Sequence, residues 1–245
     1  MKKWVLILGA ASAIAQGASS AFAKRGYNLY LAGRDNDELG RRASDLAIRH
    51  NVKVKYGSFD AEKTDGHEAF LENVLAETDS LSGIVLSVGY MGDQIKAQNY
   101  PDAEKVMKIN FTGPVSILSR CANYLEDRGD GFIVGICSVA GDRGRQSNYV
   151  YGASKGGLSL YLQGLRNRLY PQGVHVMTVK PGFVDTAMTF GMPGLFLVAS
   201  PEYVGEKIAS GVDKKANTLY VPWFWQFIML IIRSIPEMLF KRLKL

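Results

Sequence analysis

The stretch that decides the fold lies near the start of the chain, where residues 4–15 read WVLILGAASAIA. Five apolar residues, Trp4–Leu8, precede a turn of small residues and a helix-like pattern over Ser12–Lys24. A short, continuous apolar run is typical of a strand that a parallel sheet buries on both faces. Strand, tight turn and helix in this order predict the first unit of an open α/β sheet.

The same segment imitates a secretory signal, because Met1–Lys3 is basic and Ala21–Ala23 resembles a cleavage site. Cleavage there would remove a strand and a turn that the later motifs require, so we expect that the protein is not secreted. Cys121 and Cys137 lie in apolar segments. Buried thiols in a reducing compartment fit them better than a disulfide does, which favours the cytoplasm.

Strand-like and helix-like segments alternate along most of the chain, without a linker or an internal repeat. We predict one doubly wound α/β domain of the Rossmann type over residues 1–221, with a mainly parallel, seven-stranded sheet. A length of 245 residues, with 47% hydrophobic and 21% charged residues, suits such a domain. The predicted strands are Val5–Leu8, Asn28–Ala32, Val52–Tyr56, Ile84–Val88, Phe132–Cys137, Val174–Val179 and Thr218–Val221, and the predicted helices lie near 12–25, 36–49, 63–77, 101–124, 150–169 and 201–214.

Residues 222–245 are predicted to form an apolar and basic helical tail. Pro222 suits a first helical turn, residues 223–232 are apolar on nearly every face, and Pro236 is expected to break the helix before Glu237–Leu245. The apolar run is too short to span a membrane. Tryptophans beside it and a basic end favour a helix pair in a membrane interface, and packing into an oligomer interface is the alternative.

A second motif, YGASK at residues 151–155, carries candidate chemistry. Residues four apart share one face of a helix, so Tyr151 and Lys155 can point into one cleft. The lysine is expected to lower the pKa of the tyrosine, which makes Tyr151 a usable general acid or base. Ser138 follows an apolar strand-like run and could bind the same substrate oxygen. Taken alone, Tyr-x-x-x-Lys also arises by chance on helices.

Further candidates follow the predicted strands, at the edge where doubly wound sheets bind ligands. The small residues 9–15 allow backbone amides and a helix N-terminus to approach a pyrophosphate. Arg34 could pair with the 2′-phosphate of NADP, although the adjacent Asp35 leaves NAD open. Asp60 could bind an adenine amino group. The three histidines and two cysteines show no metal-ligand spacing, so no metal is expected.

Together these residues resemble the short-chain dehydrogenase/reductase family, over about residues 4–222. Departures from the family pattern are Ala13 and Ala15 in place of glycines, and Leu86–Gly89 in place of Asn-Asn-Ala-Gly. The resemblance implies an NAD(P)-dependent carbonyl reductase that forms oligomers and has no nucleic-acid partner. It implies the catalytic residues Asn110, Ser138, Tyr151 and Lys155, and the cofactor contacts Gly9, Ser12, Ala13, Ile14, Arg34, Asp60, Gly89, Tyr151, Lys155, Pro181, Gly182, Val184 and Thr186.

Residues 88–93, 139–151 and 219–243 are similar to a group within that family, the reductases of decaprenylphosphoryl-2-keto-erythro-pentose. This similarity implies a polyprenyl-phosphate-linked keto sugar of cell-envelope synthesis, an oxidase partner that supplies the ketone, and contact with the inner face of the cytoplasmic membrane. That group is associated with NADH, whereas Arg34 favours NADPH. Arg143 and Arg145 could grip the phosphodiester, or they could be solvated loop charges. The alternative is a soluble reductase of a small or acyl-type ketone.

Overall fold

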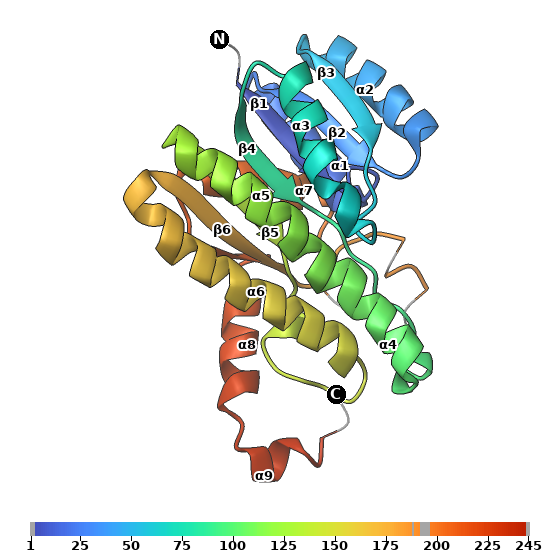
Figure 1. The fold of residues 1–245 in the computed structure, drawn as a ribbon. Helices are drawn as coiled ribbons and strands as arrows, with labels where there is room; N and C mark the ends of the chain where they lie inside the picture. The colour runs from blue at the N-terminus through green and yellow to red at the C-terminus, as the bar shows by residue number, and fades with distance from the viewer. Residues whose placement is uncertain (1–2, 188, 192–196, 244–245) are drawn as a thin grey trace.

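The computed structural model describes residues 3–187, 189–191 and 197–243, and its centre is a seven-stranded sheet (Figure 1). The strand order is β3-β2-β1-β4-β5-β6-β7, and each neighbouring pair is parallel. The predicted doubly wound sheet is therefore confirmed. The strands are β1 (Trp4–Leu8), β2 (Asn28–Gly33), β3 (Val54–Ser58), β4 (Leu81–Leu86), β5 (Gly131–Ile136), β6 (Val174–Pro181) and β7 (Thr218–Val221).

Helices cover both faces of the sheet, and β1 shows how the sequence divides between them. Val5 and Ile7 pack in the core beneath α1, α2 and α7, whereas Leu6 and Leu8 pack beneath α3, α5 and α6. Because successive side chains of a strand point to opposite faces, a strand buried on both faces must be apolar throughout. The helices are α1 (Ala13–Lys24), α2 (Asn36–His50), α3 (His67–Glu77), α4 (Tyr100–Met107), α5 (Gly113–Arg128), α6 (Tyr149–Leu169), α7 (Pro201–Asp213), α8 (Trp225–Ser234) and α9 (Glu237–Phe240).

The start of β4 differs from its prediction. The strand begins at Leu81 and ends at Leu86, so the predicted range Ile84–Val88 was placed too late. Gly83 weakened the strand pattern, yet a Cβ at this position would lie 2.1 Å from the ring of Phe132. A neighbouring strand fills the space that a side chain would need. Residues 87–90 therefore lie beyond the end of the strand, where they form part of the site.

The predicted helix over residues 101–124 is interrupted at its centre. A π-helical turn, Lys108–Thr112, separates α4 from α5. The N–H of Gly113 donates to the carbonyl of Lys108, five residues back, and Pro114 has no N–H with which to close the next helical turn. This break in the pattern holds Asn110 at the edge of the sheet.

Helices α1 and α7 touch backbone to backbone, which composition alone did not reveal. A Cβ on Gly17 would lie 2.1 Å from the carbonyl oxygen of Pro201, and one on Gly205 would lie 2.1 Å from the carbonyl carbon of Gly17. Contacts this short leave no room for a methyl group. Two glycines therefore set how closely α7 approaches α1, the helix that follows the first turn.

We expect Gly17→Ala to lower the free energy of unfolding by about 1–3 kcal/mol, because the added methyl group forces the two helices apart. Gly164→Ala is the matched control, since Gly164 lies within α6 and an added Cβ would meet nothing within 4 Å. Alanine there should stabilise the protein by up to about 1 kcal/mol. Urea denaturation of both variants checks the prediction, and equal stabilities would contradict it.

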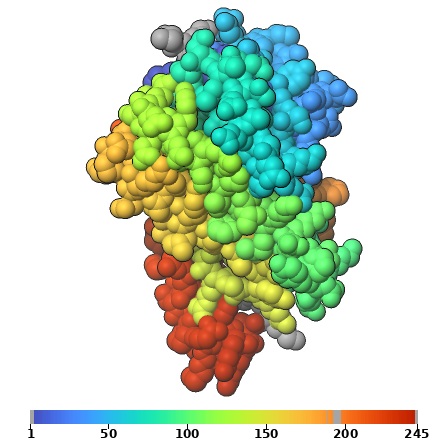
Figure 2. All heavy atoms as spheres, viewed as in Figure 1, coloured from blue at the N-terminus to red at the C-terminus, as the bar shows by residue number. Residues whose placement is uncertain are grey.

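The tail extends beyond the carboxyl ends of the strands as α8 and α9 (Figure 1). Helix α8 begins at Trp225 rather than at Pro222, because Pro222 to Phe224 form a turn in which Trp225 N donates to Pro222 O. Pro236 separates the two helices, as predicted, and α9 ends at Phe240, short of the predicted Leu245. Figure 2 shows the red tail as a projection that contacts the yellow-green segment after β5.

Candidate active site

A cleft of about 380 Å³ lies beyond the carboxyl ends of β1 to β4. This is the edge at which the sequence predicted a ligand, because the chain passes from β1 to β2 and β3 on one side and then returns to β4 on the other side of β1. Five of the predicted cofactor contacts share the cleft, and Ala13 and Ile14 begin the helix beside it. Residues that line it include Gly9, Ser12, Arg34, Phe59, Asp60, Ser87, Val88, Gly89, Tyr90 and Lys105.

The turn after β1 has a shape that only glycine allows at its first position. Gly9 has φ of 77°, and a Cβ there would lie 2.8 Å from the carbonyl oxygen of Ser87. Ser12 caps α1 by accepting a hydrogen bond from the N–H of Ala15 (3.2 Å), and its hydroxyl lies 2.8 Å from that of Ser87. A helix N-terminus and a cradle without side chains fit the pyrophosphate of a dinucleotide. Ser87 departs from the family pattern, and its contact with Ser12 connects the segment after β4 to the turn after β1.

The charged residues that follow β2 and β3 have separate roles. Asp35 caps α2, because its carboxylate accepts a hydrogen bond from the N–H of Glu38 at 3.0 Å. Arg34 is exposed, lines the cleft, and has no hydrogen-bond or ion-pair partner among the described residues. Asp60 holds its own turn, since Oδ1 accepts from the N–H of Glu62 at 3.0 Å. The guanidinium of Arg34 is thus the charged group at β2 that remains available to a ligand.

Ser138 and Tyr151 are brought together by a short turn that packs on α6. Ser138 follows β5 and caps the turn Val139–Gly141, accepting a hydrogen bond from the N–H of Ala140 at 3.1 Å. A Cβ on Gly141 would lie 2.6 Å from the backbone nitrogen of Gly156, within α6. The turn therefore rests directly on the backbone of the helix that carries Tyr151.

Burial governs the proton affinities of Tyr151 and Lys155, which are 8% and 2% exposed. It raises the pKa of Tyr151 to about 12, and a hydrogen bond with Ser138 acts in the opposite direction. It lowers the pKa of Lys155 to about 8. The prediction that Lys155 lowers the pKa of Tyr151 is wrong in this structure. The ammonium donates instead to the carbonyls of Val88 (3.0 Å) and Ile136 (3.1 Å), and desolvation of the phenolate dominates.

Asn110 is fully buried and links two parts of the site. Its amide nitrogen donates to the carbonyl of Tyr90 (2.7 Å) and to the hydroxyl of Ser154 (3.1 Å). Its amide oxygen accepts from the N–H of Tyr90 at 2.8 Å. The side chain thereby fastens the loop after β4 to helix α6, between Tyr151 and Lys155.

The remaining predicted cofactor contacts lie at the end of β6, and none is among the described residues that line the cleft. Pro181 ends the strand, and a Cβ on Gly182 would lie 1.8 Å from the indole nitrogen of Trp225. Val184 is buried and bridges to Ala199, while Thr186 lies within 3.3 Å of the hydroxyl of Thr189. In the segment that follows, Met188 and residues 192–196 lie outside the described residues.

Arg143 does not have the predicted role of a phosphate ligand, because the tail occupies its side chain. Its guanidinium donates to the carbonyls of Ile232 (2.7 Å) and Ile235 (2.6 Å), at the end of α8. It also pairs with Glu237 at 3.0 Å and lies 3.7 Å from the centre of the Phe240 ring. A cation at a helix C-terminus satisfies carbonyls that have no helical partner. Arg143 thus fastens the tail to the loop between Ser138 and Tyr151.

Arg145 lies in the same loop, but it is not held in this way. Burial lowers the pKa of its guanidinium, while Asp142 acts in the opposite direction. Its Nε is buried without a hydrogen-bond partner among the described residues. Of the two arginines that were predicted to bind phosphate, only Arg145 therefore remains a candidate.

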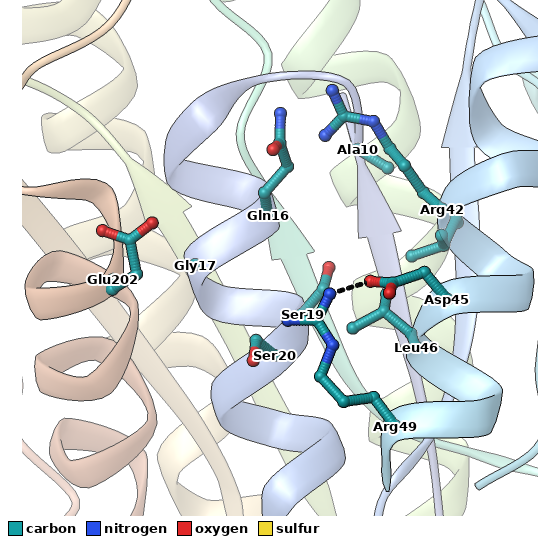
Figure 3. Close-up of a pocket in the computed structure, with 11 residues that line it drawn as sticks. Ala10, Gln16, Gly17, Ser19, Ser20, Arg42, Asp45, Leu46, Arg49 and Glu202 are labelled. Atoms are coloured by element: carbon teal, nitrogen blue, oxygen red, sulfur yellow. Dashed lines mark hydrogen bonds and ion pairs between the residues drawn. The ribbon is translucent and has the colours of Figure 1, made fainter.

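A second cavity, of about 180 Å³, opens between α1, α2 and α7 (Figure 3). Figure 3 shows Asp45 paired with Arg49 along α2, facing Gln16 and Ser19 on α1. None of the predicted catalytic residues is among the described residues that line this cavity or the cleft at the ends of β1 to β4, but this cavity also lacks all of the predicted cofactor contacts. We assign it no part in the chemistry described above.

The chain is similar in sequence to a family of dehydrogenases. Residues 3–192 match the family model of short chain dehydrogenase. The chain belongs to the short-chain dehydrogenase family. It is 35% identical over 243 residues to an uncharacterized oxidoreductase of Streptomyces coelicolor, covering 98% of this chain and 95% of that protein.

Solved structures share the fold of this dehydrogenase. A variant of actinorhodin polyketide ketoreductase with NADPH has a TM-score of 0.81 and 22% identity, covering 90% of this chain and 95% of that one. The 3-oxoacyl-[acyl-carrier protein] reductase of Brucella melitensis with NAD has a TM-score of 0.79 and 22% identity, covering 90% and 95%. The chain is therefore an oxidoreductase of the short-chain dehydrogenase family, and the two structures of similar fold carry NADPH and NAD. Within the described part of the chain, no helix combines the length and apolarity needed to cross a membrane.

Proposed function

We propose that this dehydrogenase reduces a ketone to an alcohol, with Ser138, Tyr151, Lys155 and Asn110 as its catalytic tetrad. When bound, the nicotinamide supplies the hydride that reaches the carbonyl carbon. The hydroxyl of Ser138 donates a hydrogen bond to the carbonyl oxygen, and Tyr151 gives its proton to that oxygen as the alcohol forms. Gly9, Ser12, Ala13, Ile14, Arg34, Asp60, Gly89, Lys155, Pro181, Gly182, Val184 and Thr186 are the residues that would hold the cofactor.

The observation that carries this direction of reaction is the burial of Tyr151. A phenol whose pKa is about 12 stays protonated at neutral pH, and it is then ready to donate. Alcohol oxidation needs the phenolate, which burial disfavours. The hydrogen bond between Tyr151 and Ser138 keeps the proposed proton donor next to the hydroxyl that is proposed to bind the carbonyl oxygen. The protonated form of Tyr151, which predominates at neutral pH, is therefore the form that ketone reduction requires.

For the substrate we propose a polyprenyl-phosphate-linked 2-keto pentose, reduced to its epimeric alcohol. Three buried polar atoms around the start of α6 lack hydrogen-bond partners among the described residues: Gln94 Nε2, Arg145 Nε and Asn148 Oδ1. Buried polar groups need partners, and a substrate with hydroxyl groups and a phosphate supplies acceptors and donors for them. An alcohol oxidase would supply the ketone, and the reaction would take place at the cytoplasmic face of the membrane.

An assay of the purified protein tests this proposal. The polyprenyl-phosphate-linked keto pentose should be turned over more efficiently than simple ketones and 3-oxoacyl thioesters, with NADH and NADPH each supplied. Preference for a small or acyl-type ketone would replace the proposed substrate with the alternative, to which the acyl substrate of the Brucella melitensis reductase points. Absence of turnover on every ketone would contradict the proposed reaction itself.

We also propose that Arg34 gives the enzyme a preference for NADPH. Arg34→Ala should lower kcat/KM with NADPH by about 10- to 100-fold, since a hydrogen bond to a charged group is worth about 1.5–3 kcal/mol, and leave NADH almost unchanged. Arg41→Ala is the matched control, an exposed arginine on α2 that is not among the residues lining the cleft. A parent enzyme that favours NADH would contradict this assignment of Arg34.

The outer face of the tail is proposed to contact the membrane that holds such a substrate. Trp223, Phe227, Leu230 and Ile231 are 56–67% exposed and follow one side of the α8 segment, while Met229 on the other side is buried. Met238 and Leu239 in α9 are exposed as well, and Lys241 and Arg242 follow them at exposed positions. Apolar side chains next to cations suit an interface with anionic headgroups.

Phe227→Asp with Ile231→Asp should abolish co-sedimentation with anionic liposomes, because both substitutions alter the outer face and leave Met229 in place. Ile48→Asp is the control, since Ile48 is 84% exposed on α2. Sedimentation and oligomeric state are measured together for all three proteins. If the parent ignores liposomes and the double variant dissociates an oligomer, the face is an assembly surface and membrane contact is wrong.

A further inference from the structure

Asp142 lies directly after the turn that Ser138 begins, and its carboxylate is satisfied on both oxygens. One oxygen accepts from Lys180 Nζ on β6 at 2.5 Å, and the other accepts from the hydroxyl of Tyr220 on β7 at 2.7 Å. The side chains of Asp142 and Lys180 are only 3% and 11% exposed. A buried carboxylate with two partners has one low-energy position, so it fixes the backbone that carries it.

This network holds the Ser138 turn at its far end. The N–H of Asp142 donates to the carbonyl of Val139, which closes the turn at 3.2 Å. At the near end, the N–H of Cys137 donates to the carbonyl of Val179 on β6 at 2.8 Å. Strand β6 therefore holds the backbone just before Ser138 and, through Lys180, the backbone just after it.

The third side of the turn is α6 itself. Besides the contact of Gly141 with Gly156, a Cβ on Gly152 would lie 2.8 Å from the carbonyl oxygen of Ala140. Because glycines line this contact, no flexible side chain separates the turn from the helix that carries Tyr151. A shift of the turn therefore moves Ser138 relative to Tyr151.

We propose that Asp142 is a positioning residue for the reaction, which holds Ser138 at the hydroxyl of Tyr151 through its bonds to Lys180 and Tyr220. The proposal rests on the proposed carbonyl reduction. Asp142 touches neither Tyr151 nor Lys155 in any hydrogen bond of the described residues, so its effect passes through Ser138. A displacement near 1 Å in a catalytic group is enough to lower turnover about 100-fold.

Asp142→Asn tests the proposal, since it keeps the shape of the side chain and removes its charge. We expect kcat to fall by at least about tenfold, with the dissociation constant of NADPH changed less than about threefold. Tyr220→Phe removes one of the two bonds and should give a smaller loss of the same kind. Glu206→Gln is the control, because Glu206 pairs with Arg25 between α1 and α7, far from the turn along the chain. It should change thermal stability without changing kcat.

A double-mutant cycle shows whether Asp142 acts through Ser138. In the Ser138→Ala background, Asp142→Asn should cause little further loss of kcat, because the hydroxyl that it positions is already absent. If Asp142→Asn lowered kcat by the same factor with and without the Ser138 hydroxyl, the proposal would be overturned. A crystal structure of the Asp142→Asn variant, which needs no substrate, should show Ser138 displaced from Tyr151. An undisplaced Ser138 would overturn it too, whereas lack of turnover in the parent would count against the proposed function alone.

Discussion

Tyr151→Phe is expected to lower kcat for the ketone by about 100- to 10,000-fold, the usual contribution of a positioned general acid. The substitution removes one hydroxyl and leaves the ring in its buried position, where it packs with Val106 and Ala140. Cofactor binding should change little, because the cleft residues after β1 and β2 are untouched. Steady-state kinetics, with the dissociation constant of NADPH measured by fluorescence, separates the two effects.

The control for this variant is Tyr161→Phe on the same helix. The hydroxyl of Tyr161 lies 2.9 Å from that of Ser119, so its loss also removes a hydrogen bond between helices. We expect that loss to cost about 1 kcal/mol of stability and to leave kcat unchanged. If Tyr151→Phe keeps more than a tenth of the parental kcat, Tyr151 is not the proton donor and the tetrad is wrongly assigned.

The predictions that held were those that local patterns determine. The apolar run Val5–Leu8 became a strand that begins one residue earlier, at Trp4, because a strand buried on both faces needs apolar residues throughout. The predicted strand Thr218–Val221 has its predicted bounds at the partly exposed edge of the sheet. The small residues after β1 predicted a turn that only glycine allows at Gly9. The positions of these strands and of this turn can be predicted from the local sequence, without knowledge of which residues contact them in the fold.

The predictions that failed depended on tertiary contacts. The apolar pattern of residues 101–124 continues through the π-turn, and only Pro114 hinted that the helix changes near Asn110. Arg143 was interpreted as a phosphate ligand or a solvated loop charge, because the helix end that it caps lies about 90 residues further along the chain. Spacing placed Tyr151 and Lys155 on one helix face, but it could not reveal that burial outweighs their mutual influence.

The buried lysine of the tetrad gives a prediction that joins activity to stability. Lys155→Met should lower kcat/KM by at least about 100-fold and weaken cofactor binding, because the substitution removes a buried ammonium that the carbonyls of Val88 and Ile136 hold beside the loop after β4. Burial lowers the pKa of Lys155 from 10.5 to about 8, so the folded protein binds this proton more weakly than the unfolded chain does. Stability must then rise as the pH increases from about 8 toward 10.5, since the folded state escapes the cost of a buried charge first.

Between pH 7.5 and 9.5 we expect the parent to gain about 2 kcal/mol of unfolding free energy relative to Lys155→Met, which has no proton to lose. The carbonyls of Val88 and Ile136 lose their donor in the variant at every pH, so this loss cancels in the comparison. Urea denaturation at the two pH values measures the difference, and Lys214→Met, at an exposed position, should behave as the parent. Parallel stabilities of parent and Lys155→Met across this range would mean that Lys155 keeps its proton when folded. The lysine would then be a permanent cation in the site, held by the carbonyls of Val88 and Ile136.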